Sequence, residues 1–362
     1  MARVKRLEDE NLRIVQVWLL TRLLFAVIAV ALAVMGQRPL DSVVAQWDVA
    51  HFLKISTEGY ADPNEMAFFP GWPAVLHAVG LTGFSKVMGG TVIALACSLA
   101  AAFALKRIAG AWGAIAWLLA PTAVFTAVPY TEAPFCALAF WAWERATRDK
   151  WGQAAVLAAL ASTLRVSGLF LIGALFILAL TQKLGRGQVL AVRLSWLVLP
   201  AAVIVVYVAY LYGLTGSWTA WFSAQEAGWQ RGFHWPWEAL ANHWGVLWVP
   251  NAEHPEWPWV FRAELISWIV GVLVTLVALA KKRVAEASWV AVQVLAFSVS
   301  YWLMSVTRAV LLWFPLWRLI GEFIESRPRT RAWAVLGWIA AGIAVAVQCV
   351  WAWLYFTGRW SS

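Results

Sequence analysis

Asp48 is the first residue with a chemical role to consider, because the chain of 362 residues contains only 19 acidic side chains. It follows Trp47 in a segment, 43–57, whose pattern predicts a short amphipathic helix, and His51 lies three residues on, on the same helical face. A carboxylate at a helix start lies near the positive end of the dipole and stays ionised. At an apolar interface it can act as a general base. The alternative is an N-cap, and spacing alone leaves both open.

Arg165 and Arg308 each lie between apolar runs. Ionisable groups at that depth are costly, so they usually have partners or functions. A guanidinium group matches a phosphate bidentately, whereas the alternative is that these side chains reach lipid headgroups. Glu132, in the segment Pro-Tyr-Thr-Glu-Ala-Pro, lies in a broken helix at the outer boundary. It is either part of a site or a structural partner of one of the two arginines.

Three histidines, at positions 234, 243 and 254, share a segment with Glu253 and Glu256, but their spacings of nine and eleven match no compact metal motif. We therefore predict no metal site, and a divalent cation has no support in the sequence. The sequence also has no Gly-rich phosphate loop, no Asp-x-Asp pair and no Gly-x-Ser-x-Gly, which argues against nucleotide-donor or ATP-driven chemistry and predicts no cofactor.

Nine of the 28 tryptophans fall within 213–262; they offer faces for sugar rings or form an interfacial belt.

Composition excludes a soluble protein of this size. Hydrophobic residues make up 62% and charged residues 13%, about half the usual ~25%, and the mean hydropathy is +0.70. Apolar runs of about 20 residues recur along the chain, the length that spans a bilayer. The formal charge of +9 lies at the ends of these runs, so it indicates membrane topology and no nucleic-acid partner. We predict an all-α polytopic protein with one multi-pass domain, 1–362.

Charge counting predicts the topology. We interpret 14–36 as a retained signal-anchor helix, the alternative being a cleaved signal peptide. The run 68–84 is short and carries Pro70 and Pro73, so we expect a re-entrant or surface-lying helix. This arrangement places 19 Lys and Arg residues inside and 8 outside, with Arg22 in the first helix. It predicts a cytoplasmic amino end, outer loops at 37–87 and 213–262, and about eleven crossings: 14–36, 88–105, 111–129, 131–144, 151–164, 168–182, 190–212, 263–280, 286–305, 309–322 and 332–356.

Several motifs, taken in order, resemble the PIG-V family of GT-C type glycosyltransferases, which includes the GPI mannosyltransferase that adds the second mannose. Departures are Gly71 for Leu, Ser56 for Ala and Ala309 for Tyr, and they leave the substrate open. The motifs cover about 46–320: Gln46-Trp47-Asp48-Val49-Ala50-His51-Phe52-Leu53-Lys54-Ile55 with Gly59-Tyr60, Ala67-Phe68-Phe69-Pro70-Gly71-Trp72-Pro73, Val128-Pro129-Tyr130-Thr131-Glu132, Thr163-Leu164-Arg165-Val166-Ser167-Gly168-Leu169, Trp221 through Gln225 and Trp229 to Arg231, and Thr307-Arg308 through Pro315-Leu316.

The resemblance implies transfer of a sugar, most often mannose, from a polyprenyl-phosphate sugar to an acceptor at the outer interface, with inversion. Asp48 would take the acceptor's proton, with Asp62 and Glu65 as fallback bases. The phosphate would lie on Arg165, Arg308 and Arg231. Further site candidates are His51, Lys54, Glu132, Gln225, Trp229 and His234.

The donor and the bilayer are the expected partners; a glycolipid, a glycan and a protein all remain open as acceptor. The absence of an Asn-x-Ser/Thr sequon and the short chain favour a bacterial, actinobacterial plasma-membrane protein. Two other functions stay open. A transporter or flippase of a lipid-linked sugar would need polar sites near the midplane, and a non-catalytic scaffold subunit would not need Asp48.

Overall fold

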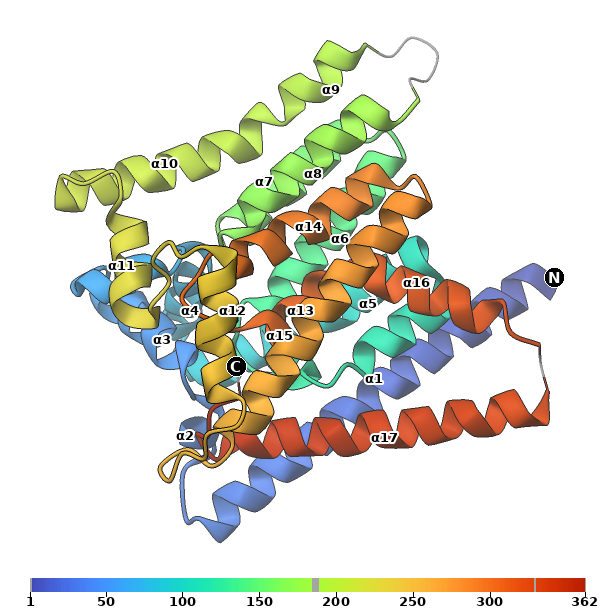
Figure 1. The fold of residues 1–362 in the computed structure, drawn as a ribbon, viewed down its shortest axis with the longest axis horizontal. Helices are drawn as coiled ribbons and strands as arrows, with labels where there is room; N and C mark the ends of the chain where they lie inside the picture. Colours follow the sequence, from blue (N-terminus) through green and yellow to red (C-terminus); the bar gives the residue numbers. More distant parts are fainter. Residues whose placement is uncertain (1, 184–188, 329, 362) are drawn as a thin grey trace.

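The computed structural model describes residues 2–183, 189–328 and 330–361, which fold into helices and connecting loops without a strand (Figure 1). Arg186 and Arg329, two of the residues used to predict the topology, lie outside the described residues. In chain order the helices are α1 (Ala2–Met35), α2 (Leu40–Val44), α3 (Asp48–Glu58), η1 (Pro63–Ala67), α4 (Gly71–Leu81), α5 (Lys86–Leu118), η2 (Ala123–Thr126), α6 (Glu132–Thr147), α7 (Trp151–Ser162), α8 (Ser167–Thr181), α9 (Leu190–Trp196), α10 (Val198–Thr215), α11 (Ala220–Trp229), α12 (Pro236–Val246), α13 (Trp257–Ala280), α14 (Val284–Ser298), α15 (Val306–Ala309), η3 (Val310–Leu312), α16 (Phe314–Glu325) and α17 (Arg331–Phe356).

The predicted all-α membrane protein is confirmed. Among the described residues, five helical segments are long and apolar enough to cross a bilayer: Leu7–Met35, Lys86–Leu118, Leu190–Thr215, Trp257–Ala280 and Arg331–Phe356. Three shorter apolar helices, α7, α8 and α14, stand beside them. The count of eleven crossings stays a prediction, because several predicted runs are broken into pieces shorter than a bilayer.

Gly110 divides α5, counted above as one segment, into two helical pieces. Its backbone, with φ of 77°, lies in the left-handed region that favours glycine. Before it, Lys106 hydrogen-bonds Asn11 (2.8 Å) and Ser98 pairs with Trp18 (2.8 Å). After it, Thr126 accepts a bond from Arg22 of α1 (2.7 Å). The chain therefore reverses at Gly110, as the separate predicted runs 88–105 and 111–129 require.

The two ends of the bundle differ, and we name them for what they carry. The end at which α1 begins, beside Lys106, is the basic end. The opposite end carries α2, α3, α4 and α11, and we call it the site end (Figure 1). The helix predicted over 43–57 is split there into α2 and α3. The run 68–84 forms the 11-residue α4, about 16 Å long, which is too short to cross the ~30 Å core.

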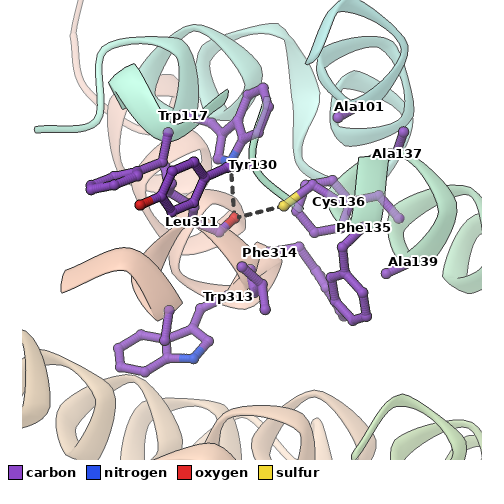
Figure 2. Close-up of a cluster of buried hydrophobic side chains, with 14 of the residues drawn as sticks. Ala101, Trp117, Tyr130, Phe135, Cys136, Ala137, Ala139, Leu311, Trp313 and Phe314 are labelled. Carbon is purple, nitrogen blue, oxygen red and sulfur yellow. Dashed lines mark hydrogen bonds between the residues drawn. The ribbon is translucent and has the colours of Figure 1, made fainter. Parts of the chain in front are cut away.

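The predicted run 309–322 is not one helix, because α15, η3 and α16 follow each other with breaks. Breaks free backbone carbonyls, and a buried free carbonyl must find a donor. The Leu311 carbonyl accepts from Trp117 Nε1 (2.9 Å) and Cys136 Sγ (3.5 Å), as Figure 2 shows. The Leu312 carbonyl accepts from Trp289 Nε1 (2.9 Å). These buried tryptophans fill the core and donate hydrogen bonds to the carbonyl groups that the breaks leave free.

Candidate functional site

Asp48, Glu132, Arg165 and Arg308, which are distant in sequence, meet at the site end, and we call them the ion-pair cluster. Arg308 donates from Nε and Nη2 to Glu132 Oε1 (2.9 and 2.8 Å) and from Nη2 to Asp48 Oδ2 (2.9 Å). Arg165 Nη1 lies 3.0 Å from the same Glu132 oxygen. Glu132 is fully buried, whereas Asp48 and Arg165 keep 18% and 21% of their side chains exposed. The two arginines thus share one buried acid, and Asp48 is the accessible carboxylate.

Asp48 is the first residue of α3, and a strained residue sets its position. Trp47 has φ of 52°, a left-handed conformation that is uncommon for a non-glycine residue. Its indole Nε1 donates to the Arg359 carbonyl (3.3 Å), and its ring meets Trp360 edge-on at 5.3 Å. The carboxyl-terminal segment therefore helps to hold the turn that aims Asp48.

Tyr130 connects the start of α3, where Asp48 lies, to the turn that carries Glu132. The Asp48 backbone N–H donates to its hydroxyl group (3.1 Å), and Tyr130 precedes Glu132 by two residues in the turn before α6. The Arg308 guanidinium lies over the Tyr130 ring at 4.8 Å and over the Phe125 ring at 5.1 Å. Such cation–π contacts orient a guanidinium group while its donors stay directed at the acids.

Glu264 positions the backbone before Arg308, and sequence reasoning missed it. This buried acid of α13 accepts from the backbone N–H groups of Ser305 (3.0 Å) and Thr307 (2.8 Å) and from the Thr307 hydroxyl (3.2 Å). Ser305 has φ of 66°, so the turn needs such support. The sequence did carry a signal for it, because Glu264 is the second residue of the apolar run 263–280, where an acid is costly and usually has a partner or a function.

A second polar group surrounds His51, one turn along α3 from Asp48. His51 Nδ1 lies 3.2 Å from Glu65 Oε1, and Lys54 Nζ lies 3.1 Å from Asp62 Oδ2 and 3.4 Å from Glu65 Oε1. The bond from the Asn64 backbone N–H, followed by that from Lys54, lowers the pKa of Asp62. The bond to Asp62 raises the pKa of Lys54. Both fallback bases, Asp62 and Glu65, are therefore already paired with cations.

Aromatic rings enclose this group. His51 stacks on Phe68 with ring centroids 4.9 Å apart, and Trp229 of α11 meets both rings edge-on, at 5.6 Å and 5.2 Å. Gln225, a predicted site residue, instead donates to the Ala67 carbonyl (3.2 Å) and fastens α11 to η1. The structure thus brings Trp229 to His51 and gives Gln225 a structural bond.

Arg231 is not a member of the ion-pair cluster, but it is close enough to interact electrostatically with Arg308, Asp48 and Arg165. It donates to the Met304 carbonyl (3.3 Å), and its guanidinium stands 5.9 Å from the Phe297 ring centre. Burial and the Arg308 charge lower the pKa of Arg231 to about 10, so it stays protonated at neutral pH. Arg231 is therefore a third positive charge close to Arg308.

The three histidines of 213–262 are separate. His234 Nδ1 lies 3.8 Å from Glu238, and His254 lies 3.4 Å from Glu256. His243 is buried and hydrogen-bonds the Phe261 carbonyl (2.9 Å); burial lowers its pKa to about 4. Across the described ranges, no three His, Cys, Asp or Glu side chains are grouped so that they could hold a metal ion.

Comparisons with known proteins bear on the family. No protein-family model matches the chain. It is 30% identical over 150 residues to human GPI alpha-1,6-mannosyltransferase 2 and 29% identical over 151 residues to the rat protein, and each match covers 36% of this chain and 30% of the relative. GPI mannosyltransferase 2 of Cryptococcus neoformans var. neoformans is 31% identical over 114 residues, 26% of this chain and 27% of the relative.

These matches confirm the resemblance to the PIG-V family. The matched stretch of this PIG-V-like chain spans less than a third of each relative's length. Among solved structures, the chain is similar to ArnT from Cupriavidus metallidurans bound to undecaprenyl phosphate, with a TM-score of 0.48 and 16% identity over 92% of this chain and 69% of that chain.

Proposed function

We propose that this PIG-V-like chain is a GT-C type glycosyltransferase that moves mannose from a polyprenyl-phosphate mannose to an acceptor hydroxyl, with inversion. The observation that carries the proposal is the ion-pair cluster, in which the accessible Asp48 carboxylate and two arginines share one end of a membrane-embedded bundle. A base beside fixed cations is what a transfer with a phosphate leaving group requires. The GPI mannosyltransferases similar to part of the chain support the choice of mannose.

The proposed step needs one base and one leaving group. Asp48 takes the proton as the acceptor O–H bond breaks, and the acceptor oxygen forms a bond to the anomeric carbon. The bond from that carbon to the phosphate oxygen breaks, and polyprenyl phosphate leaves with one more negative charge. Arg308 and Arg165 stabilise that charge in a site where water is scarce, with Arg231 nearby. No nucleotide takes part in this step, and we propose that no cofactor or divalent cation does.

Arg308 links donor binding to the base. In the structure its Nη2 group bonds both Asp48 and Glu132. A donor phosphate that takes a place on Arg308 competes with Asp48, whereas the buried Glu132 keeps its two arginines. We therefore expect the donor to bind first and to release Asp48 for the acceptor hydroxyl.

The side of the membrane follows from charge. The basic end would face the cytoplasm of a bacterial cell and the site end its outer face. Exposed tryptophans of the 213–262 segment, such as Trp237 at 63% and Trp259 at 69% exposure, suit a headgroup interface or an acceptor sugar. The acceptor is a hydroxyl of a glycolipid, a glycan or a protein.

A transfer assay with the purified full chain in liposomes tests the proposal. Synthetic polyprenyl-phosphate mannose is supplied with a phosphoinositol mannoside, a cell-wall glycan fragment or a Ser/Thr peptide, and Asp48→Asn is the matched control. We expect a mannosylated product from one acceptor class and none from the control. If the donor instead crosses the bilayer without reacting in both proteins, the chain is a flippase and the proposal fails.

A further inference from the structure

A groove at the basic end, far from the ion-pair cluster, has no part in the proposed function. Two adjoining cavities of about 500 and 660 Å³ run between α6, α7 and α9 and share Gly152, Gln153 and Trp196 as lining residues. Arg107, on the α5 pass that also carries Lys106, bonds Glu144 of α6 (2.7 Å), so this groove lies at the end where α1 begins.

The groove is polar at one end and apolar at the other. Its polar end is lined by Asp149 and Lys150, at the turn between α6 and α7, and by Arg193 of α9. Its apolar end is lined by Trp141, Val156, Leu157 and Trp196. Lys150 precedes Leu157 by seven residues, which is about 10 Å along a helix. Val156 and Trp196 are 50% and 45% exposed, so the apolar wall is open to lipid.

Positive charge around Glu144, beside the groove, exceeds the negative charge that faces it. The carboxylate of Glu144, 2% exposed, is shared by Arg107 (2.7 Å), Arg145 (2.9 Å) and Arg148 (2.7 Å). One acid cannot neutralise three guanidinium groups. Arg145 and Arg107 are also held over the Trp141 ring, at 5.0 and 5.7 Å.

The ion pair of Arg193 and Asp149 does not change this excess of positive charge. Arg193 Nη2 contacts Asp149 Oδ1 at 2.6 Å, and the two charges cancel. Lys150, which is exposed, adds a further positive charge. Arg148 keeps 49% of its side chain exposed, so its remaining donors are accessible. Two of the surplus cations, Arg145 and Lys150, line the groove itself, beside its apolar wall.

We propose that this groove binds one anionic phospholipid of the leaflet at the basic end, with its phosphate on Arg145 and Lys150 and an acyl chain along Trp196 and Val156. Guanidinium groups bind phosphate through paired hydrogen bonds, and basic pockets between membrane helices are suited to anionic headgroups. The site is separate from the donor site and does not depend on the transferase proposal.

Native mass spectrometry of the purified full chain tests this, with phosphatidylglycerol and phosphatidylcholine of identical acyl chains as probes. We expect one high-affinity phosphatidylglycerol and a weaker phosphatidylcholine. The double variant Arg145→Gln/Lys150→Gln, in which Glu144 keeps Arg107 and Arg148, loses about 30-fold in phosphatidylglycerol affinity, from the contribution of each basic residue near an anionic headgroup. Trp196→Ala weakens both lipids and keeps the headgroup preference.

The matched control removes the same charge elsewhere at the basic end. Lys281→Gln/Arg327→Gln changes two exposed cations, of which Lys281 is paired with Glu322 (2.8 Å), and should alter affinity less than threefold. An equal loss in the control means that diffuse charge attracts the lipid, and the site is refuted. Equal binding of the two lipids, an unchanged Trp196→Ala, or displacement by millimolar inorganic phosphate also overturns it.

Discussion

Asp48 and Glu132 both bond Arg308, yet the structure predicts opposite consequences when each is neutralised. Asp48→Asn keeps the shape of the side chain and an oxygen that can accept from Arg308, while Arg308 retains its two bonds to Glu132. The exchange replaces an ion pair by a hydrogen bond from the charged guanidinium to a neutral amide oxygen, which costs about 1 kcal/mol. Removal of the base costs about 10²–10⁴-fold in turnover.

Glu132→Gln should instead destabilise the fold. Glu132 is fully buried and is the shared partner of Arg308 and Arg165, so its loss leaves uncompensated positive charge in the interior. Breaking a buried pair from one side costs about 3–5 kcal/mol, a large part of the ~5–15 kcal/mol that stabilises most proteins. Asp48→Asn should thus be a folded, inactive protein and Glu132→Gln an unstable one.

Thermal unfolding in detergent and single-turnover transfer of mannose separate the two variants. The reasoning is refuted if Asp48→Asn melts as low as Glu132→Gln, since Asp48 is then structural, or if it transfers within a few-fold of wild type. Activity lost instead in Asp62→Asn or Glu65→Gln would reassign the base. If all three variants transfer mannose normally, none of these three acids is the base.

Further predictions concern donor binding, packing and pH. Arg308→Lys should lower turnover about ten- to a hundred-fold in the transfer assay, because an ammonium group lacks the fork that serves two acceptors. Gly71→Ala should lower the melting temperature by the ~1–3 kcal/mol of an overpacked site, because its Cβ would collide with the Thr163 side chain, whereas Gly337→Ala, with open space around it, should not. His243 binds a proton less readily when folded, so unfolding should become easier by about 2 kcal/mol as pH falls from 7.5 to 5; a fluorescence melt of His243→Gln should lack this dependence. Chelation with EDTA should leave turnover unchanged, because arginines supply the compensating charge; a loss that Mg²⁺ restores would contradict this.

The candidate site could be predicted residue by residue but not as a set of contacts. Asp48, Glu132, Arg165 and Arg308 stand out because charges are rare in an apolar chain and costly at a bilayer. Glu132 contacts both arginines in the structure, as a structural partner of either would. No sequence pattern, however, indicates that Arg308 also bonds Asp48, because helix packing alone brings residues 260 positions apart together.

The positions of the helices could be predicted from the apolar runs, but the points at which a run breaks into separate helices could be predicted less well. Gly110 marks the reversal between two runs, and its positive φ explains the glycine. The run 309–322 contains Pro315, which lies in the first turn of α16 and signals a helix start there. The 3-10 turn at Val310–Leu312 just before it depends on distant donors such as Trp117 and Trp289. Gly71, a departure from the family pattern, has a local reason, because its backbone donates to the Thr163 carbonyl (2.8 Å) and leaves no room for a side chain.

A structure of the full chain with bound polyprenyl phosphate tests the central claim most directly. The account predicts phosphate oxygens within about 3 Å of the Arg308 and Arg165 guanidinium groups, with the Asp48–Arg308 bond lengthened and Glu132 still paired with both arginines. A phosphate bound away from these arginines, with the Asp48–Arg308 bond intact, would contradict it.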